Sequence, residues 1–312
     1  MRGLAVVNPK ASSYDRGTAQ RSLRILEGAL DLEVVETTRP GHAVQIVAER
    51  SDGLDAVVVL GGDGTVNEAL GGLLEPAPAA PPLLAALPFG CVNVFSRHLG
   101  LPASPEQAAV QLADRLATRQ PRPIGVGRVV ASLDGAPAGE RWFCLSVGIG
   151  FDADIVAAVE RRRSGGRPAS TLLYARCAVG EFFRPGPRPR MRLSIDGHAG
   201  EQSEAVIVGN HAPWTYAGNR PIWATPCADW SRGLDVMTLA RLSLVPTLRQ
   251  LARMVGRRPP PRNGGGVRHH LDLDRLDVTA SAPARWQVDG DALPAATSWT
   301  ITAYPQAVSV PL

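Results

Sequence analysis

Three glycines and one aspartate stand together in Gly61-Gly62-Asp63-Gly64, between an apolar run and a helical pattern that resumes at Thr65. Residues 56–60 are short, apolar and β-branched, which is typical of a parallel strand covered on both faces. A glycine-rich turn that leads into a helix presents N–H groups and the positive end of the helix dipole, and both attract phosphate. So many glycines also indicate backbone at positive φ or packed closely against another group. The stretch therefore predicts a phosphate site.

Asp63 does not suit a bare phosphate, because the two negative charges repel each other. It suits Mg²⁺, a water molecule or an acceptor hydroxyl. A plain alternative is a tight strand-to-helix turn in which Asp63 or Thr65 caps the helix. The stretch is not a Walker loop, since no Gly-Lys-Ser/Thr follows it, and it lacks the G-x-G-x-x-G pattern of dinucleotide sites. Any nucleotide site here is therefore of another kind.

Polar turns follow three further apolar runs, at residues 8–13, 37–42 and 88–93. In an open α/β sheet, ligands collect where the strands end at their carboxyl edge. Asn8 could therefore bond a nucleotide and Lys10 a phosphate. An ordinary Asn-Pro turn and a solvated lysine explain these two residues equally well.

Strand and helix patterns alternate to about residue 120, which predicts a parallel sheet with helices on both faces. After residue 123 most apolar runs look like strands separated by turns. The helical patterns in this part are residues 155–163, residues 171–183 and a weaker one at 244–255. We therefore expect an α/β domain at residues 1–123 and a mostly antiparallel, sandwich-like β domain at residues 124–299. The tail, about residues 300–312, is expected to pack back on the first domain.

The composition limits the classes of partner. The net charge is +4, the pI is about 9.2, and Lys10 is the single lysine among the basic residues, which permits anionic lipid or nucleotide. Aromatic residues make up 5% and no RNA-binding signature occurs, so nucleic acid is not expected. The four cysteines form no C-x-x-C pair, which argues against zinc and disulfides and predicts a reduced, cytoplasmic setting. No apolar run is long enough to span a bilayer, so any membrane contact is expected to be peripheral.

One segment combines aromatic and basic character. It comprises residues 181–186, with Phe182 and Phe183, and the arginines at 161–163, 188 and 190. A peripheral membrane-binding edge has this composition. A solvated loop with two core phenylalanines also has it, and the loop is the favoured interpretation.

Six stretches in series resemble the diacylglycerol kinase catalytic-domain family, the soluble lipid kinases that include bacterial diacylglycerol kinases and sphingosine kinases. They are Asn8-Pro9-Lys10, Gly61-Gly62-Asp63-Gly64-Thr65-Val66-Asn67-Glu68, Pro88-Phe89-Gly90-Cys91-Val92-Asn93, Gly148-Ile149-Gly150-Phe151-Asp152-Ala153, Gly233-Leu234-Asp235-Val236 and Val288-Asp289-Gly290-Asp291. Only the second is specific by itself, but the series runs nearly end to end. The resemblance implies a nucleotide-binding α/β domain, a β-rich domain and an active cleft between them.

The resemblance also assigns roles to residues. It implies ATP binding by Asn8, Lys10, Thr37, Gly61, Gly62, Asp63, Gly64, Thr65, Val66, Asn67, Cys91 and Asn93. Asp289 is the implied general base, and Asp63 competes for that role, as in the sphingosine-kinase-like members. Asp291 stands where the family more often has Glu. Phosphoryl transfer to a hydroxyl needs positioning, Mg²⁺ that arrives with ATP, and one carboxylate near the acceptor proton.

Four residues depart from the family pattern: Cys91 replaces Thr, Val94 replaces Asp, and Gly125 and Arg232 replace two aspartates. Some members carry a structural Mg²⁺ near the last two positions. Losing both carboxylates, one of them to an arginine, removes oxygen ligands and adds positive charge. This accessory metal is therefore expected to be absent.

The expected activity is transfer of the γ-phosphate of ATP to a lipid hydroxyl, with diacylglycerol as the default acceptor. A sphingoid base or another amphiphilic alcohol is the near alternative. NAD kinases share Gly-Gly-Asp-Gly-Thr, but residues 88–97 resemble the lipid-kinase loop. A lipid-binding or regulatory protein without catalysis is the alternative from another class, motivated by Cys91, Gly125 and Arg232. A homodimer is left open.

Overall fold

The computed structural model describes residues 1–75, 81–118, 120–163 and 171–312. The chain divides into two compact units, unit 1 (Met1–Ile124 with Gln306–Leu312) and unit 2 (Gly125–Pro305). The chain passes from unit 1 to unit 2 within strand β5 (Pro121–Leu133) and returns within β16 (Asp291–Pro311).

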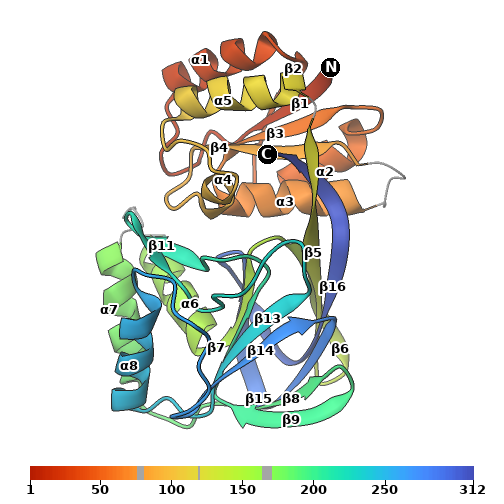
Figure 1. The fold of residues 1–312 in the computed structure, drawn as a ribbon. Helices are drawn as coiled ribbons and strands as arrows, with labels where there is room; N and C mark the ends of the chain where they lie inside the picture. The colour runs from red at the N-terminus through yellow and green to blue at the C-terminus, as the bar shows by residue number, and fades with distance from the viewer. Residues whose placement is uncertain (76–80, 119, 164–170) are drawn as a thin grey trace. The chain divides into compact units, whose positions relative to one another are not determined.

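Unit 1 is built on a parallel sheet. Its strands are β1 (Arg2–Val7), β2 (Asp31–Glu36), β3 (Ala56–Gly61) and β4 (Leu83–Pro88), in the order β2-β1-β3-β4. Its helices are α1 (Arg16–Glu27), α2 (His42–Arg50), α3 (Asp63–Leu74), α4 (Val94–His98) and α5 (Pro105–Thr118). Helix α1 packs against α5 and α2 against α3, and Figure 1 shows the two pairs on opposite faces of the sheet. The predicted parallel sheet with helices on both faces is confirmed.

The apolar strands explain this arrangement. Every residue of β3 is buried, as a strand covered on both faces requires. Helix α3 begins at Asp63, two residues before the predicted start, and Gly62 is its N-cap. The turn between β3 and α3 is therefore shorter than the run of glycines suggests.

Unit 2 is built on a large, antiparallel sheet, which confirms the predicted class of its fold. Along the sheet the strands follow the order β14-β13-β10-β7-β15-β16-β5-β6, and β8 pairs with both β15 and β9. The remaining bounds are β6 (Ala136–Phe143), β7 (Ser146–Gly150), β8 (Met191–Ile195), β9 (His198–Ser203), β10 (Ala205–Gly209), β13 (Leu234–Leu239), β14 (Val267–Leu273) and β15 (Arg275–Val288). A separate two-stranded sheet joins β11 (Thr215–Ala217) to β12 (Arg220–Ile222). Apart from β11 and β12, the described strands of unit 2 thus belong to one continuous ten-stranded sheet, with a core that contains the buried Trp286 and Trp299.

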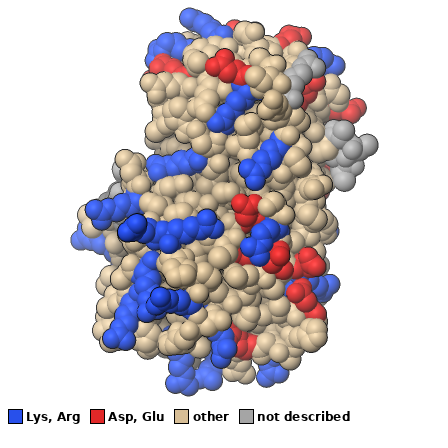
Figure 2. Space-filling model, viewed as in Figure 1, with Lys and Arg blue, Asp and Glu red and all other residues tan. Residues whose placement is uncertain are grey.

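Among the described residues, three helices accompany this sheet: α6 (Phe151–Arg163), α7 (Thr171–Phe182) and α8 (Leu244–Met254). Helix α6 begins four residues earlier than predicted, so that Asp152 lies in its first turn. On the face drawn in Figure 2, basic side chains gather over the side of unit 2 that carries α7 and α8. Within the described residues, no helix is both long and apolar enough to cross a membrane.

Candidate functional site

Four loops of unit 1 lie at the carboxyl edge of its sheet, one after each strand. They begin at Asn8, Thr37, Gly62 and Phe89. Strands β2 and β3 flank β1, so the strand order changes direction between β1 and β3. Ligands of open α/β sheets bind at such a switch point. The residues predicted to bind ATP therefore share one edge of one sheet.

Asn8 joins the two strands at the switch point. Its backbone N–H donates to the Leu60 carbonyl at 2.9 Å, and its Nδ2 donates to Oγ1 of the buried Thr65 at 2.9 Å. Its Oδ1 accepts from the backbone N–H of Lys10 at 3.0 Å. Asn8 thus holds the loop after β1 against the first turn of α3.

Lys10 links the loops after β1 and β2. Its Nζ donates to the Thr38 carbonyl at 3.3 Å, and the Thr38 N–H in turn donates to His42 Nδ1 at 3.1 Å. The neighbouring Thr37 is buried, and its N–H donates to the Val7 carbonyl at 2.8 Å. An ammonium group has three donors, so Lys10 keeps N–H groups for a phosphate while it joins the loops.

Gly62 and Gly90 bring two of these loops into direct contact. A Cβ added at Gly90 would lie 2.4 Å from Gly62 Cα, and a Cβ added at Gly62 would lie 3.1 Å from Gly90 Cα. Gly62 has φ −99°, and Gly61 and Gly64 belong to β3 and α3. Close backbone approach, and not a left-handed conformation, therefore explains the glycine-rich turn.

The first turn of α3 limits which groups can meet a phosphate. The N–H groups of Thr65 and Val66 both donate to the Gly62 carbonyl, at 3.0 and 3.1 Å. The side chains of Val66 and Asn67 are buried. The N–H groups of Asp63 and Gly64 have no partner within the helix by its geometry. A phosphate at this edge would therefore meet the first two residues of α3, while Val66 and Asn67 pack inside.

Asp63 caps a different helix from the one expected. Its Oδ2 accepts from the Val94 N–H at 3.0 Å and its Oδ1 from the Phe95 N–H at 2.9 Å, at the start of α4. The alternative in which Asp63 or Thr65 caps α3 is wrong, because Gly62 is the N-cap there and no side chain bonds it. Burial of the carboxyl group raises the pKa of Asp63, although the two N–H donors act to lower it.

Glu68 accepts backbone N–H groups at the start of α2, as Asp63 does at the start of α4. Its two carboxylate oxygens accept from the N–H groups of Gly41, at 2.8 Å, and Ala43, at 3.1 Å. Two carboxylates of α3 thus fix the starts of two neighbouring helices. These pairings could not be read from local pattern, because the partners of Glu68 are 27 and 25 residues away.

Asn93 closes the loop after β4. It has φ 55°, its Nδ2 donates to the Gly90 carbonyl at 2.8 Å, and its Oδ1 accepts from the Gly90 N–H at 2.7 Å. Ser13, which the sequence analysis did not single out, donates from Oγ to the same carbonyl at 3.0 Å. Its place in the polar turn at residues 8–13 was the available signal. Cys91 is exposed.

In unit 2, Asp289 lies in the two-residue turn of the β15–β16 hairpin, with φ 47°. Its Oδ1 accepts from the N–H groups of Leu145 at 3.0 Å and Ser146 at 2.8 Å, and its Oδ2 from that of Cys144 at 3.1 Å. The residue is buried, at 7% exposure. The hairpin alternative and the carboxylate role are therefore compatible, because the turn itself holds the carboxylate in one orientation.

A second buried aspartate supports this turn. Asp152 Oδ2 accepts from Gln287 Nε2 at 2.8 Å, and Gln287 Oε1 accepts from the Gly290 N–H at 2.8 Å. Burial raises the pKa of Asp152 to about 6. The pair was missed in the sequence, although Asp152 stands in one of the quoted motifs.

Two residues that depart from the family pattern have other neighbours in unit 2. Arg232 Nη2 lies 3.4 Å from Asp272 Oδ2, and a Cβ added at Gly125 would lie 2.9 Å from the Trp230 carbonyl oxygen. In the part of the chain that the structure describes, no group of three or more His, Cys, Asp or Glu side chains could hold a metal ion. The absence of the accessory metal stays a prediction. Asp291 is exposed at the start of β16.

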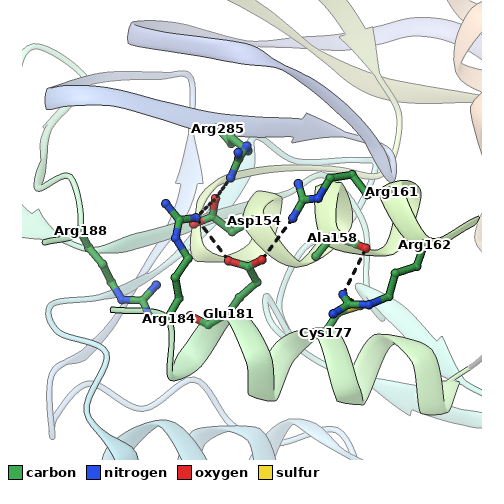
Figure 3. Close-up of polar contacts among 9 residues, drawn as sticks. All are labelled: Asp154, Ala158, Arg161, Arg162, Cys177, Glu181, Arg184, Arg188 and Arg285. Carbon is green, nitrogen blue, oxygen red and sulfur yellow. Dashed lines mark hydrogen bonds and ion pairs between the residues drawn. The ribbon is translucent and has the colours of Figure 1, made fainter. Parts of the chain in front are cut away.

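The arginines near residues 181–186 are paired with acids inside unit 2 (Figure 3). Asp154 accepts from Arg285 at 2.8 Å and lies 3.8 Å from Arg184. Glu181 lies 3.4 Å from both Arg161 and Arg184. These basic groups are therefore occupied within their own cluster.

Arg188 ends this cluster. Its Nη2 donates to the carbonyls of Glu181 at 2.8 Å and Phe182 at 2.9 Å, at the carboxyl end of α7. Phe182 packs edge-on against Phe151, but Phe183 is 67% exposed, so only Phe182, itself partly buried, packs against the core. The side chain of Arg163 lies outside the described part. The geometry resembles a loop held by hydrogen bonds and ion pairs more than a membrane-binding edge.

Known proteins are similar to this chain over part of its length. A profile described as "Diacylglycerol kinase catalytic domain" matches residues 2–129. A "Probable lipid kinase YegS-like" of Chromohalobacter salexigens is 36% identical over 148 residues, which are 46% of this chain and 43% of that protein. A "Diacylglycerol kinase" of Mycobacterium tuberculosis is 29% identical over 252 residues, 78% of this chain and 71% of that protein. The chain thus spans less than half the length of the first relative.

Solved structures share the fold. A diacylglycerol kinase structure from Bacillus anthracis has a TM-score of 0.71 at 21% identity, covering 99% of this chain and 96% of that one. An NAD kinase from Archaeoglobus fulgidus has a TM-score of 0.53 at 15% identity, covering 99% and 93%. These likenesses concern the fold alone. Over its residues 2–129, the chain is similar to the diacylglycerol kinase catalytic-domain family.

Proposed function

We propose that the chain is an ATP- and Mg²⁺-dependent lipid kinase that transfers the γ-phosphate to a lipid hydroxyl, with diacylglycerol as the acceptor and phosphatidic acid as the product. The contact of Gly62 with Gly90 beside the start of α3 carries the proposal, because it brings two loops of this sheet edge together at a helix N-terminus in a chain whose residues 2–129 match a diacylglycerol kinase catalytic domain. A sphingoid base or another amphiphilic alcohol is the alternative acceptor.

The edge of unit 1 supports the nucleotide half of this chemistry. Catalysis of phosphoryl transfer consists mostly of positioning and charge stabilisation. The start of α3 supplies N–H groups and a favourable dipole, and Lys10 supplies a positive charge at the same edge. Asn8, Asp63 and Asn93 hold the loops in place through bonds to their neighbours. We expect Cys91 and Thr37 to flank the nucleotide.

Mg²⁺ fits as a partner of ATP more than as a resident of the protein. It is commonly held by one or two carboxylates together with substrate phosphates and water, and it neutralises the charge of the transferred phosphoryl group. The described residues offer no cluster of three acidic, histidine or cysteine side chains. Asp63 is the carboxylate at this edge of unit 1 that we propose for the metal side, since it stands in the first turn of α3.

Asp289 is the proposed general base, with Asp291 as a nearby second carboxylate and Asp63 as the competitor. Both oxygens of Asp63 accept N–H groups of α4, which favours a positioning role for it. Asp289 also accepts three N–H groups, so its carboxylate is fixed in direction before substrate arrives. The two aspartates can be separated by kinetics, because loss of the base lowers turnover while ATP binding persists.

The test is an assay of the purified chain with γ-labelled ATP and a panel of diacylglycerol, a sphingoid base and other lipid alcohols in mixed micelles, with the product identified by mass spectrometry. Phosphatidic acid as the main product supports the proposal, and another phosphorylated lipid selects the alternative acceptor. ATP consumption at background with every alcohol would support the catalytically silent lipid-binding protein that Cys91, Gly125 and Arg232 motivate. Phosphorylation of NAD would favour the NAD-kinase reading of the shared fold. We also propose that the protein is cytoplasmic and contacts membranes only at their surface.

A further inference from the structure

Helix α8 presents a row of apolar side chains to solvent. Leu244, Leu248, Leu251 and Val255 are 48%, 55%, 46% and 43% exposed, and Val245 beside them is 56% exposed. The three leucines are spaced i, i+4 and i+7, which places them on one side of the helix, and Val255 follows as its C-cap. The row is therefore a continuous apolar strip and not scattered surface residues.

The inward side of α8 is the more polar one. Its buried residues are Thr247, Gln250 and Met254. Gln250 Nε2 contacts the sulfur of Met237 at 3.3 Å, inside unit 2. A helix that only had to cover a core would bury its leucines and expose its glutamine and threonine. The outward leucines therefore suit a second apolar phase.

The segment that contains this strip is rich in arginine. Residues 241–268 contain seven arginines, at positions 241, 249, 253, 257, 258, 262 and 268, and no aspartate or glutamate. Within the described residues, Arg249, Arg253 and Arg262 make no ion pair, in contrast to the paired arginines of α6 and α7. The basic side chains over this side of unit 2 are visible in Figure 2.

A cavity lies against the arginine flank of α8. Its volume is about 410 Å³, and its lining includes Arg249, Arg253 and Arg262 together with Gly264 and Gly265. It has room for a phosphate group beside three guanidinium groups, which bind phosphate well. One helix thus carries both an apolar strip and, on another flank, a cavity lined by arginines.

We propose that α8 is a membrane-docking element, which lies in the surface of an anionic phospholipid bilayer with its apolar strip among the acyl chains. Arg249, Arg253 and Arg262 then meet the lipid phosphates. An amphipathic helix that carries both apolar side chains and arginines binds anionic bilayers in two ways. Its apolar side chains are buried among the acyl chains, and its arginines are attracted to the lipid phosphates. The proposal deepens the proposed function, on which it rests for its purpose, because it gives the kinase its contact with the surface that holds a lipid substrate.

Charge favours a bilayer over a second copy of the chain. In a two-fold dimer the same patch faces itself. The seven arginines of residues 241–268 would then oppose seven more, with no acid in either segment to pair with them. Anionic lipid supplies the complementary charge, so it is the occupant to test.

The experiment is co-sedimentation of the full chain with phosphatidylcholine vesicles, with and without phosphatidylglycerol, in the absence of ATP and diacylglycerol. We expect binding that requires phosphatidylglycerol and weakens with salt. The double variant Leu248→Ser/Leu251→Ser should bind at least about tenfold more weakly. Val110→Ser on α5 is the matched control, since Val110 is 49% exposed and should not affect binding.

A second double variant tests the arginines and leaves the apolar strip unchanged. Arg249→Gln/Arg253→Gln should lose about fivefold in binding per arginine at low salt and respond less to added salt. Full vesicle binding by both double variants would overturn the proposal. A dimer in ultracentrifugation that Leu248→Ser/Leu251→Ser dissolves, without vesicle binding by the unaltered chain, would also overturn it.

The outcome can be separated from that of the kinase assay. Vesicle binding is measured without the reaction, so an inactive chain that binds leaves the docking proposal standing. An active chain in mixed micelles that ignores vesicles leaves the proposed function standing and refutes the docking element.

Discussion

Replacing Asp152 by Asn should stabilise unit 2 at neutral pH. Asp152 is 8% exposed, and its Oδ2 accepts one hydrogen bond from Gln287. Burial raises its pKa from 3.8 to about 6. The folded state therefore keeps this proton over a pH range in which the unfolded chain releases it. Stability should fall as the pH rises from about 4 to about 6, because the folded state binds more protons there.

The size of the effect follows from the pKa difference. A shift from 3.8 to about 6 is about 2 units, and each unit corresponds to about 1.4 kcal/mol, so the ionised Asp152 costs about 3 kcal/mol above pH 6. Asparagine keeps an oxygen that accepts from Gln287 but carries no charge. Asp152→Asn should therefore raise the free energy of unfolding by up to about 3 kcal/mol at pH 7.5 and change it little at pH 4.

Tryptophan fluorescence during urea unfolding measures the stability of unit 2, which contains Asp152. All six tryptophans lie between residues 142 and 299, within unit 2. Asp154→Asn is the matched control on the same helix, because Asp154 is paired with Arg285 at 2.8 Å and its loss should not stabilise. Equal stabilisation by Asp152→Asn at both pH values, or destabilisation at pH 7.5, would refute the assignment of the raised pKa to this buried carboxyl.

Two further predictions concern the edge of unit 1. Gly90→Ala should weaken ATP binding at least about tenfold, because its Cβ would lie 2.4 Å from Gly62 Cα and the two loops must separate, whereas Gly71→Ala, with nothing within 4 Å, should not; calorimetric titration with an ATP analogue checks this, and equal affinities would contradict it. Thr65→Val should cost about 1–2 kcal/mol of stability and Thr65→Ser much less, because only valine removes the acceptor of the Asn8 amide; thermal unfolding followed by circular dichroism compares them, and indistinguishable variants would show that the bond contributes nothing.

The elements of unit 1 were readable from local pattern. Residues 56–60 predicted a buried parallel strand, and β3 is buried throughout. The reason for the glycines was not readable, because Gly62 meets Gly90 across 28 residues of sequence and no pattern in one loop names its partner in another. Asp63 looked like a cap for its own helix and caps α4, for the same reason.

In unit 2, periodicity predicted that α8 exists but not which way it faces. An apolar repeat is normally assigned to the core, yet α8 buries Thr247, Gln250 and Met254. The link from Asp152 through Gln287 to the turn at Gly290 was also hidden, since it joins residues 135 apart in sequence. Such long-range hydrogen bonds depend on the register of the sheet, which single-sequence reasoning does not supply.

Phosphate transfer from γ-labelled ATP to diacylglycerol in mixed micelles, measured for the unaltered chain and for Asp289→Asn, tests the central proposal most directly. We expect labelled phosphatidic acid from the unaltered chain, and turnover lowered about 100-fold or more in Asp289→Asn with ATP affinity retained. Absence of any labelled lipid across the panel of alcohols would contradict the lipid-kinase function. Full turnover by Asp289→Asn would contradict the role of the hairpin carboxylate.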